Sequence, residues 1–547
     1  MGNKKWIFLI LLLATTLRFV HLSFHDSYTD EAILAFRAIG LIDYDGSLIQ
    51  TTPWQWVPVV PWWAHLSFHD HPVVFFLLQH AAMRVFGENL FAVRLPSVLA
   101  GIASVALLFF IAKRLFDERT GFIAAALLAV SSYHLWVSRL GIQDGVIIAI
   151  LLLILFLLFK TKEDARYWIL VGAALGIGII TKYTIFIAFP IIALFGMIYR
   201  VPLIKSRFFW YGVFVMVLFA SPSWIYNLML YRTFGHFDFQ ISGFLGQEVA
   251  EWRYRMGRAQ VGELTDRFHN FFLALLYANS QWFNALTGIS IVAALSFWWK
   301  KRSPALLFLL GCTILIFLWF FVLGSTYRFV VMILPFFILL ISVMLSRAPR
   351  SFVFVFFTAE LLFSMNTFFL PQPVGPPLIA YANIREETEA YGFQTLDAYL
   401  GRLLSGRVSA LFGSPAYQFL TDLQNRRIQK LKASGAVSYP IMIIYDHDMN
   451  FVANLWLFQR RIIYSGWPIL PDDDFLTITG DERELFFRRQ GIEEFLYIAT
   501  LREEVRNAPS ERVGKRDTFV PYLLSKGILP EIIADRWGTP AFAVYHF

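Results

Sequence analysis

The sequence has little charge and almost no cysteine for its length. Asp, Glu, Lys and Arg make up 16% of its 547 residues, whereas apolar residues make up 57% and aromatic residues 18%. So many long apolar runs exclude an ordinary soluble globular fold. The single cysteine, Cys312, lies within such a run, which excludes an internal disulfide and indicates a small core residue. We therefore expect a polytopic membrane protein.

Phosphate-binding glycine loops and a removable leader are also missing. No GxGxxG leads from a strand into a helix and there is no P-loop, so a soluble-nucleotide site is not predicted. The apolar start of the chain continues into Arg18 and Phe19 without a small-residue cleavage site, which indicates a retained first helix. The formal net charge is +8, but Lys and Arg gather in short gaps between apolar segments. That pattern encodes membrane orientation and does not indicate a nucleic-acid partner.

Eleven apolar segments are candidates for membrane spans, each of which needs roughly 20 residues. With a cytoplasmic N-terminus, the basic clusters fall inside, and the short outer loops keep only Arg139, Lys182 and Arg328. The expected spans are 5–23, 91–113, 120–138, 145–160, 167–181, 183–199, 208–228, 281–299, 304–323, 329–346 and 351–370.

The segment 71–87 is apolar but short, and counting it as a span would turn every later basic cluster outward. We interpret it as an interfacial or re-entrant helix, which makes residues 24–94 one large external loop. A second external loop, 229–280, is long and polar and is a candidate mobile lid. The membrane domain is expected to cover 1–370.

A Pro/Gly-rich linker at 371–377 opens a more polar tail that runs to residue 547. This tail alternates short β-like runs with helical patterns, which predicts a small α/β domain outside the membrane. The expected strands are 408–412, 441–445, 495–499 and 541–547, and the expected helices are 391–404 and 417–431.

Two acidic positions are candidates for catalysis. Asp30 and Glu31 stand at the head of an apolar helical run, where the positive helix end favours the ionised carboxylate. Asp144 lies in a second outer loop, between two apolar helices. Carboxylates that converge at a membrane surface suit general base catalysis or metal-assisted transfer. The alternatives are a helix-capping role for Asp144 and a solvated first turn for Asp30 and Glu31.

Two cations are candidates for binding a lipid phosphate. Lys182 precedes Tyr183 and Arg328 follows Tyr327, each at the expected outer end of a helix. Such positions suit a clamp on a phosphate at the membrane surface. The alternative is that both side chains simply extend to the nearer interface.

The segment His-Leu-Ser-Phe-His-Asp occurs twice, at 21–26 and 65–70. Each copy has two histidines four residues apart, which could chelate a metal in a helix. Ordinary interfacial histidines are the alternative, and the sequence offers no physical reason for the repeat.

An ordered set of short motifs resembles the GT-C class of polytopic glycosyltransferases, and within it the family of protein O-mannosyltransferases and lipid A aminoarabinose transferases. The resemblance covers residues 1–346, and it rests on the order of the motifs. They are Asp30-Glu31-Ala32, His71-Pro72, Arg94-Leu95-Pro96-Ser97, Arg114-Leu115-Phe116, Ser138-Arg139 with Asp144, Thr181-Lys182-Tyr183, and Tyr327-Arg328-Phe329 before Pro335.

The resemblance implies a GT-C fold at the plasma membrane and transfer of a sugar from a polyprenyl-phosphate donor, with inversion, at the outer face. The acceptor would be a glycolipid, a protein or a polymer. Asp30 would be the catalytic base with Glu31 in support, and Asp144 would help to place the acceptor or a metal. Lys182 and Arg328 would stabilise the leaving phosphate.

The same resemblance assigns substrate binding to Asp70, His71, Arg139 and Tyr327. Asp70 and His71 stand where lipid A transferases carry Glu and Lys. This departure leaves open what the pair does, including whether a divalent cation takes part.

Two other function classes fit a chain of many apolar helices: a transporter or flippase of a lipid-linked glycan, and an assembly scaffold. Transporters tend to place ionisable groups near the bilayer midplane, often in two related halves. Here the acidic residues gather in the expected outer loops, and the halves do not repeat. The sequence therefore favours a transferase at the membrane surface.

Overall fold

The computed structural model of the protein describes residues 2–27, 29–44, 46, 50–252, 262–411, 415–449, 454–506 and 515–547. The chain divides into two compact units, of which the first holds 1–22 and 61–387 and the second holds 23–60 and 388–547. This division differs from the predicted one at two places. Residues 24–60 join the second unit, and the end of the first unit lies beyond residue 370.

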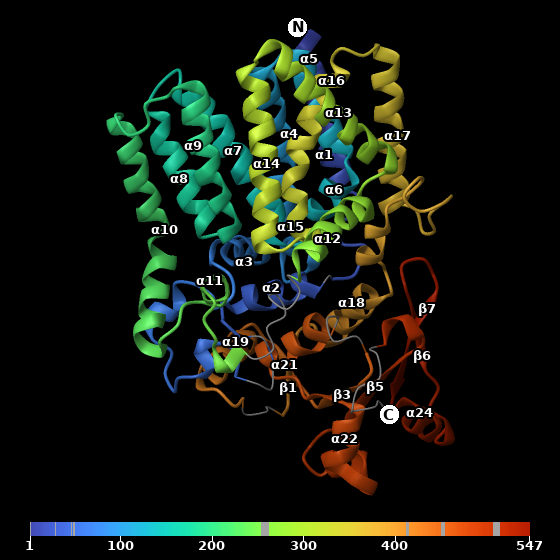
Figure 1. The fold of residues 1–547 in the computed structure, drawn as a ribbon. Helices are drawn as coiled ribbons and strands as arrows, with labels where there is room; N and C mark the ends of the chain where they lie inside the picture. Colours follow the sequence, from blue (N-terminus) through green and yellow to red (C-terminus); the bar gives the residue numbers. More distant parts are fainter. Residues whose placement is uncertain are drawn as a thin grey trace. The chain divides into compact units, whose positions relative to one another are not determined.

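The first unit is built of helices, most of them apolar, and its long helices run side by side (Figure 1). They are α1 Gly2–Phe19, α3 Val74–Phe86, α4 Leu90–Leu115, α5 Glu118–Val130, α6 Ser132–Arg139, α7 Gln143–Thr161, α8 Tyr167–Ile179, α9 Ala188–Tyr199, α10 Arg207–Phe234, α11 Phe239–Leu245, α12 Leu264–Ala278, α13 Gln281–Lys301, α14 Pro304–Leu323, α15 Tyr327–Val330, α16 Leu334–Leu345 and α17 Arg350–Phe368.

Seven helical spans among the described residues are long and apolar enough to cross a membrane, and the bent pair α5 and α6 would make eight. The chain is therefore a multi-pass membrane protein, but the predicted number of eleven spans is not confirmed. The expected span 167–181 is the 13-residue α8, which extends only about 20 Å against a hydrocarbon core of about 30 Å. The segment 71–87 is likewise a short helix, α3.

Helices α8 and α10 touch backbone to backbone. A Cβ atom at Gly172 would lie 1.9 Å from the carbonyl oxygen of Gly212, and one at Gly212 would lie 2.3 Å from the carbonyl oxygen of Trp168. Only glycine fits at such a contact, which is a common way for membrane helices to pack closely. These two glycines therefore fix where α10 crosses α8.

Three buried arginines, Arg18, Arg94 and Arg139, hold the first unit together near the end of α1. Carbonyl groups in the last turn of a helix have no partner within that helix, and guanidinium groups can bind them. Arg18 donates to Ala14 and Ala129, Arg94 donates to Leu22, and Arg139 donates to Leu17, Arg18, Val20 and His21.

The second unit is an α/β domain, as predicted for the tail. Its five-stranded sheet has the order β4-β3-β5-β7-β6, in which β3, β4 and β5 are parallel and β6 and β7 run antiparallel to their neighbours. Its main elements are α2 Thr29–Gly40, α18 Phe393–Leu404, β1 Arg407–Ser409, α19 Gln418–Ala433, β2 Val437–Tyr439, β3 Ile441–Tyr445, α21 Arg460–Ser465, β4 Ile469–Pro471, α22 Asp472–Thr479, α23 Glu484–Arg488, β5 Glu494–Thr500, α24 Arg516–Ser525, β6 Glu531–Ala534 and β7 Pro540–His546.

The central strand β3 is buried along its whole length, because apolar clusters cover both faces of the sheet. Helix α2 packs within this unit through Phe36, whose ring lies 5.4 Å from that of Tyr464 and whose carbonyl accepts the Tyr464 hydroxyl at 2.6 Å. The apolar side of the α2 helix, which was predicted from its spacing, therefore serves the second unit.

A buried carboxylate, Asp472, lies where β4 ends. It accepts hydrogen bonds from the Tyr497 hydroxyl and from the main-chain N–H groups of His447 and Lys515. Burial, followed by the nearby charge of Asp446, raises the pKa of Asp472 to about 6. The second unit therefore holds an acid that ionises near neutral pH.

This pKa predicts that the second unit loses stability as pH rises. The folded state holds the Asp472 proton more tightly than the unfolded state, whose pKa is near 3.9. The resulting stabilisation is full below about pH 4 and lost above about pH 6, and it amounts to about 3 kcal/mol. Asp472→Asn should therefore raise the unfolding temperature at pH 7.5 more than at pH 5. The control is Asp517→Asn, at an exposed acid; equal pH dependence in all three proteins would contradict the prediction.

Candidate active site

A buried ion pair joins two of the predicted site residues. Asp144 lies in the first turn of α7, and Lys182 lies in extended backbone between α8 and a short 3₁₀ helix, Tyr183–Ile187. The Lys182 ammonium is 2.7 Å from the Asp144 carboxylate, and both side chains are less than a tenth exposed. Sequence reasoning named both residues but gave them separate tasks, so their pairing is a new finding.

The two predicted phosphate-binding cations lie around one aromatic ring. The Lys182 ammonium is 4.7 Å from the ring centre of Phe329, and the Arg328 guanidinium is 5.7 Å from the same centre. An ammonium has three N–H donors, of which the Asp144 carboxylate takes one. Lys182 can therefore hold its counter-charge and donate to an anionic oxygen at the same time.

Tyr327, which precedes Arg328, is held through its main-chain carbonyl and through its side-chain hydroxyl. Its carbonyl accepts a hydrogen bond from the Tyr133 hydroxyl, and its own hydroxyl donates to Glu387 at 2.9 Å. The Tyr277 hydroxyl also reaches Glu387, at 3.5 Å. Burial raises the pKa of Glu387, whereas these hydroxyls and Arg328 lower it. Sequence reasoning missed Glu387, because a charged run in a linker has the signature of a solvated segment.

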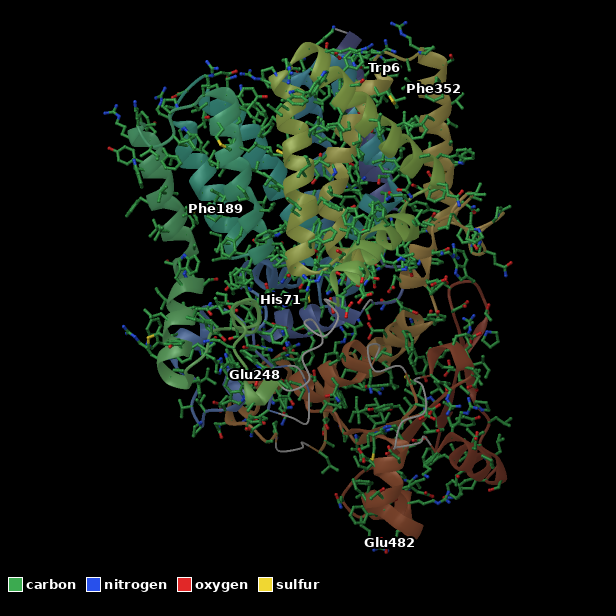
Figure 2. The ribbon with its side chains drawn as sticks, in the orientation of Figure 1. Trp6, His71, Phe189, Glu248, Phe352 and Glu482 are labelled. Carbon is green, nitrogen blue, oxygen red and sulfur yellow. The ribbon has the colours of Figure 1, made fainter. Side chains whose placement is uncertain are left out.

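The predicted pair Asp70 and His71 lies just before α3, where Figure 2 labels His71. The His71 ring nitrogen is 3.3 Å from the Asp70 carboxylate. The N–H group of Val74 donates to the Ile180 carbonyl at 3.0 Å, two residues before Lys182 in the chain. The structure thus joins the start of α3, three residues after His71, to the end of α8, which carries the chain to Lys182.

Arg139 is fully engaged in the fold. Its guanidinium donates to carbonyl groups at the end of α1 and lies 5.0 Å from the ring centre of Phe369. These contacts give it a structural task, and its predicted role in substrate binding stays a prediction.

Asp30 and Glu31 occupy the first turn of α2, in the second unit. Glu31 is fully buried and Asp30 is half-buried. Asp30 lies in the first helical turn, as expected from the sequence, and its role as the catalytic base stays a prediction. Its convergence with Asp144, which belongs to the first unit, stays a prediction.

The two copies of the repeated hexapeptide have different contacts. In the first copy, the Asp26 carboxylate accepts the N–H groups of Tyr391 and Gln394 at 2.7 and 2.9 Å, at the start of α18. In the second copy, the Asp70 carbonyl accepts the Gln240 side chain at 2.6 Å. Among the described residues, no group of three His, Cys, Asp or Glu side chains lies so that it could hold a metal ion.

The predicted lid, 229–280, contains the end of α10, α11 and α12, while Arg253, Arg255 and Arg258 lie outside the described residues. No sequence pattern indicated the polar cluster of this region. There the Asp238 carboxylate accepts the Tyr183 hydroxyl at 2.7 Å and the Asn227 amide at 2.9 Å. Movement of this region stays a prediction.

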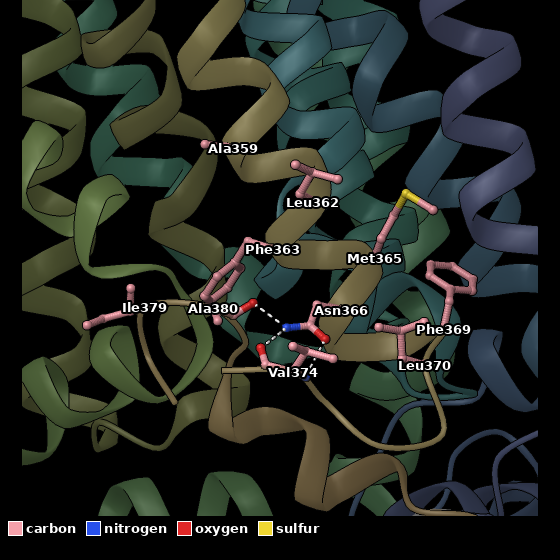
Figure 3. Close-up of a pocket in the computed structure, with 10 residues that line it drawn as sticks. All are labelled: Ala359, Leu362, Phe363, Met365, Asn366, Phe369, Leu370, Val374, Ile379 and Ala380. Carbon is pink, nitrogen blue, oxygen red and sulfur yellow. Dashed lines mark hydrogen bonds between the residues drawn. The ribbon is translucent and has the colours of Figure 1, made fainter. Parts of the chain in front are cut away.

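A pocket of about 480 Å³ lies along the end of α17 (Figure 3). Its one polar lining side chain, Asn366, is bound to the main chain of Val374 and Ala380. The pocket therefore offers no side chain for a sugar or a phosphate, and one of its lining residues, Phe369, lies beside the guanidinium of Arg139. It is lined by Ala359, Leu362, Phe363, Met365, Asn366, Phe369, Leu370, Val374, Ile379 and Ala380.

Comparison with known proteins places this geometry in context. Residues 70–226 match the family model described as dolichyl-phosphate-mannose-protein mannosyltransferase. An undecaprenyl phosphate-aminoarabinose arabinosyl transferase of Edwardsiella ictaluri is 27% identical over 151 residues, which cover 25% of this chain and 26% of that protein. A putative mannosyltransferase of Bacillus subtilis, YkcB, is 30% identical over 141 residues, which cover 25% and 20%. The matches thus span about a quarter of the first relative and a fifth of the second.

The match to a solved structure extends over the whole chain. The crystal structure of ArnT from Cupriavidus metallidurans bound to undecaprenyl phosphate covers 99% of this chain and 98% of its own, with a TM-score of 0.54 and 14% identity. Identity at this level shows the fold alone. The chain therefore has the GT-C fold, and its predicted resemblance to the protein mannosyltransferases and aminoarabinose transferases is confirmed.

Proposed function

We propose that this protein is a glycosyltransferase that moves a sugar from a polyprenyl-phosphate donor to an acceptor at the outer face of the plasma membrane. The observation that carries the proposal is the placement of Lys182 and Arg328 around Phe329, in a chain with the GT-C fold. Two cations at the end of membrane helices suit a phosphate that cannot leave the bilayer. In this proposal the N-terminus is cytoplasmic, and the residues from 371 onward lie outside.

The proposed chemistry is an inverting displacement. Asp30 takes the proton of an acceptor hydroxyl while the hydroxyl oxygen bonds to the anomeric carbon of the sugar. The bond from that carbon to the phosphate oxygen breaks, and its electron pair leaves with the polyprenyl phosphate. Lys182 and Arg328 stabilise the charge that grows on this oxygen, and their effect is larger where water is scarce.

The remaining site residues have supporting roles in the proposal. Asp144 holds Lys182 in place, and Glu31 supports Asp30. Asp70, His71 and Tyr327 contact the donor or the acceptor. The names of the similar proteins include both an arabinosyl and a mannosyl transferase, so the donor sugar is a pentose or a hexose. The acceptor is a glycolipid, a protein or a polymer.

Loss of the protein should change the pool of lipid-linked sugars. We expect one polyprenyl-phosphate sugar to accumulate several-fold in membranes of cells that lack the chain, because its consumption stops. Mass spectrometry of lipid extracts measures this pool. An unchanged pool, compared with cells that express the native chain, would count against the proposal.

A flippase could also change this pool, so a second assay separates the two functions. Purified protein is added in detergent to solubilised membranes of the lacking strain, where no bilayer separates the two faces. A transferase converts the accumulated lipid to polyprenyl phosphate under these conditions. A flippase leaves it intact.

A further inference from the structure

Asp238 joins three parts of the first unit through its carboxylate. The residue is 2% exposed and stands directly before α11. One carboxylate oxygen accepts the N–H group of Ile241 at 2.9 Å, which caps the helix. The other accepts the Tyr183 hydroxyl at 2.7 Å and the Asn227 amide at 2.9 Å. The N–H group of Asp238 in turn donates to the Asn227 side-chain oxygen at 2.8 Å.

The first connection leads to the buried ion pair. Tyr183 follows Lys182 in the chain, and its side chain is buried. Its hydroxyl is anchored on Asp238, and its ring stacks on Phe186 with the centres 5.8 Å apart. Because Tyr183 is held in place, the backbone at Lys182 is also held, and with it the direction of the Lys182 side chain.

The second connection leads to the 69–71 segment. The N–H group of Phe239 donates to the His69 carbonyl at 2.8 Å, and the Gln240 side chain donates to the Asp70 carbonyl at 2.6 Å. Both donors lie in the first turn of the helix that Asp238 caps. One carboxylate thus fixes the spacing between Lys182 and the segment that carries Asp70.

A helix cap alone does not need these side-chain contacts. The Asp117 carboxylate caps α5 by accepting the N–H and hydroxyl groups of Thr120, at 2.7 and 3.0 Å, and both contacts stay within that helix. The Asp238 carboxylate, by contrast, accepts donors from α10, from the 3₁₀ helix Tyr183–Ile187 and from its own helix. Its contacts therefore connect three separate elements of the first unit.

We propose that Asp238 is a positioning residue for sugar transfer, which holds Lys182 and the 69–71 segment at the spacing that the leaving phosphate requires. The inference rests on the proposed function. When a group that stabilises only the transition state is displaced, kcat falls while substrate binding stays nearly unchanged. Misplacement by an ångström is enough for a large loss of rate.

The test uses purified protein in detergent with solubilised membranes of the lacking strain, which supply both the accumulated lipid-linked sugar and the acceptor. Asp238→Asn should lower kcat about 10- to 100-fold and change KM for that lipid by less than about threefold. Tyr183→Phe, which removes one contact and keeps the helix cap, should show the same pattern with a smaller loss. Asp117→Asn, the same chemical change at another cap, should leave both constants unchanged.

A double variant identifies the route of the effect. If Asp238 acts through Lys182, then Asp238→Asn should cost far less in a Lys182→Met background than in the native protein, because coupled residues are not additive. Equal fold losses in both backgrounds would overturn the proposal. So would native kinetics for Tyr183→Phe beside a loss in Asp238→Asn, because a cap alone would then explain the result.

These outcomes are separable from a failure of the proposed function. If Lys182→Met and Asp30→Asn also keep native rates, the transferase assignment is wrong. If they lose activity while Asp238→Asn and Tyr183→Phe keep it, only the positioning role is wrong.

Discussion

Asp30→Asn should lower the rate of sugar transfer by about 100- to 10,000-fold, the range that a positioned general base contributes. The amide keeps the size of the side chain but cannot take the acceptor proton. Asp30 stands in the first turn of α2, where the positive end of the helix is favourable for negative charge. Mass spectrometry should therefore find the donor lipid accumulating in cells that carry the variant at native expression.

The chain offers a matched control for this variant. Asp117 and Glu118 repeat the Asp-Glu dipeptide at the start of another helix, α5. Asp117→Asn should leave the lipid pool as it is in the native strain. Full transfer by Asp30→Asn would exclude this carboxylate as the base, and it would move a transport or scaffolding function ahead.

Lys182→Met should have two separate effects. The uncompensated charge of Asp144, which stays buried, should lower the free energy of unfolding by about 3–5 kcal/mol. Loss of the ammonium should also lower kcat by about 100- to 1,000-fold, because the leaving phosphate loses a charged donor. Thermal unfolding followed by the fluorescence of the 17 tryptophans measures the first effect.

The double variant Lys182→Met with Asp144→Leu distinguishes the two effects. Removal of both charges should restore most of the unfolding temperature, since a buried pair can be replaced by apolar groups at little cost. Transfer should stay lost. Recovery of transfer along with stability would mean that the pair serves only the fold, and that the donor phosphate is held elsewhere.

The sequence predicts elements best where local pattern and burial agree. The strand 441–445 forms with the predicted bounds, and the helix expected at 391–404 is α18, Phe393–Leu404. Strand β4 has only three residues and is stabilised by pairing with β3. No local sequence pattern predicts this pairing. The number of spans was harder to predict, because apolar residues continue to Ile180 and resume at Tyr183, whereas the helix α8 ends at Ile179 after only 13 residues.

The candidate site likewise combines residues that a local sequence pattern indicates with residues that only the fold brings together. Lys182 and Asp144 could be named because a charge in an apolar chain is conspicuous, but their 2.7 Å contact depends on how α7 and α8 pack. Asp238 and Glu387 gave no such signal, since both lie in polar segments where acids are ordinary. Their importance comes only from the tyrosines that the fold brings to them, Tyr183 and Tyr327.

The close contact between Gly172 and Gly212 influences where the later part of helix α10 lies, including Asn227. Asn227 lies 15 residues beyond Gly212, which is about 22 Å along a helix, with Pro222 between them. A methyl group added at Gly172 would meet the backbone of α10 and push that helix away from α8, which would also displace Asn227 from Asp238. The position of the polar cluster thus depends on glycines that have no side chain, at the contact between α8 and α10.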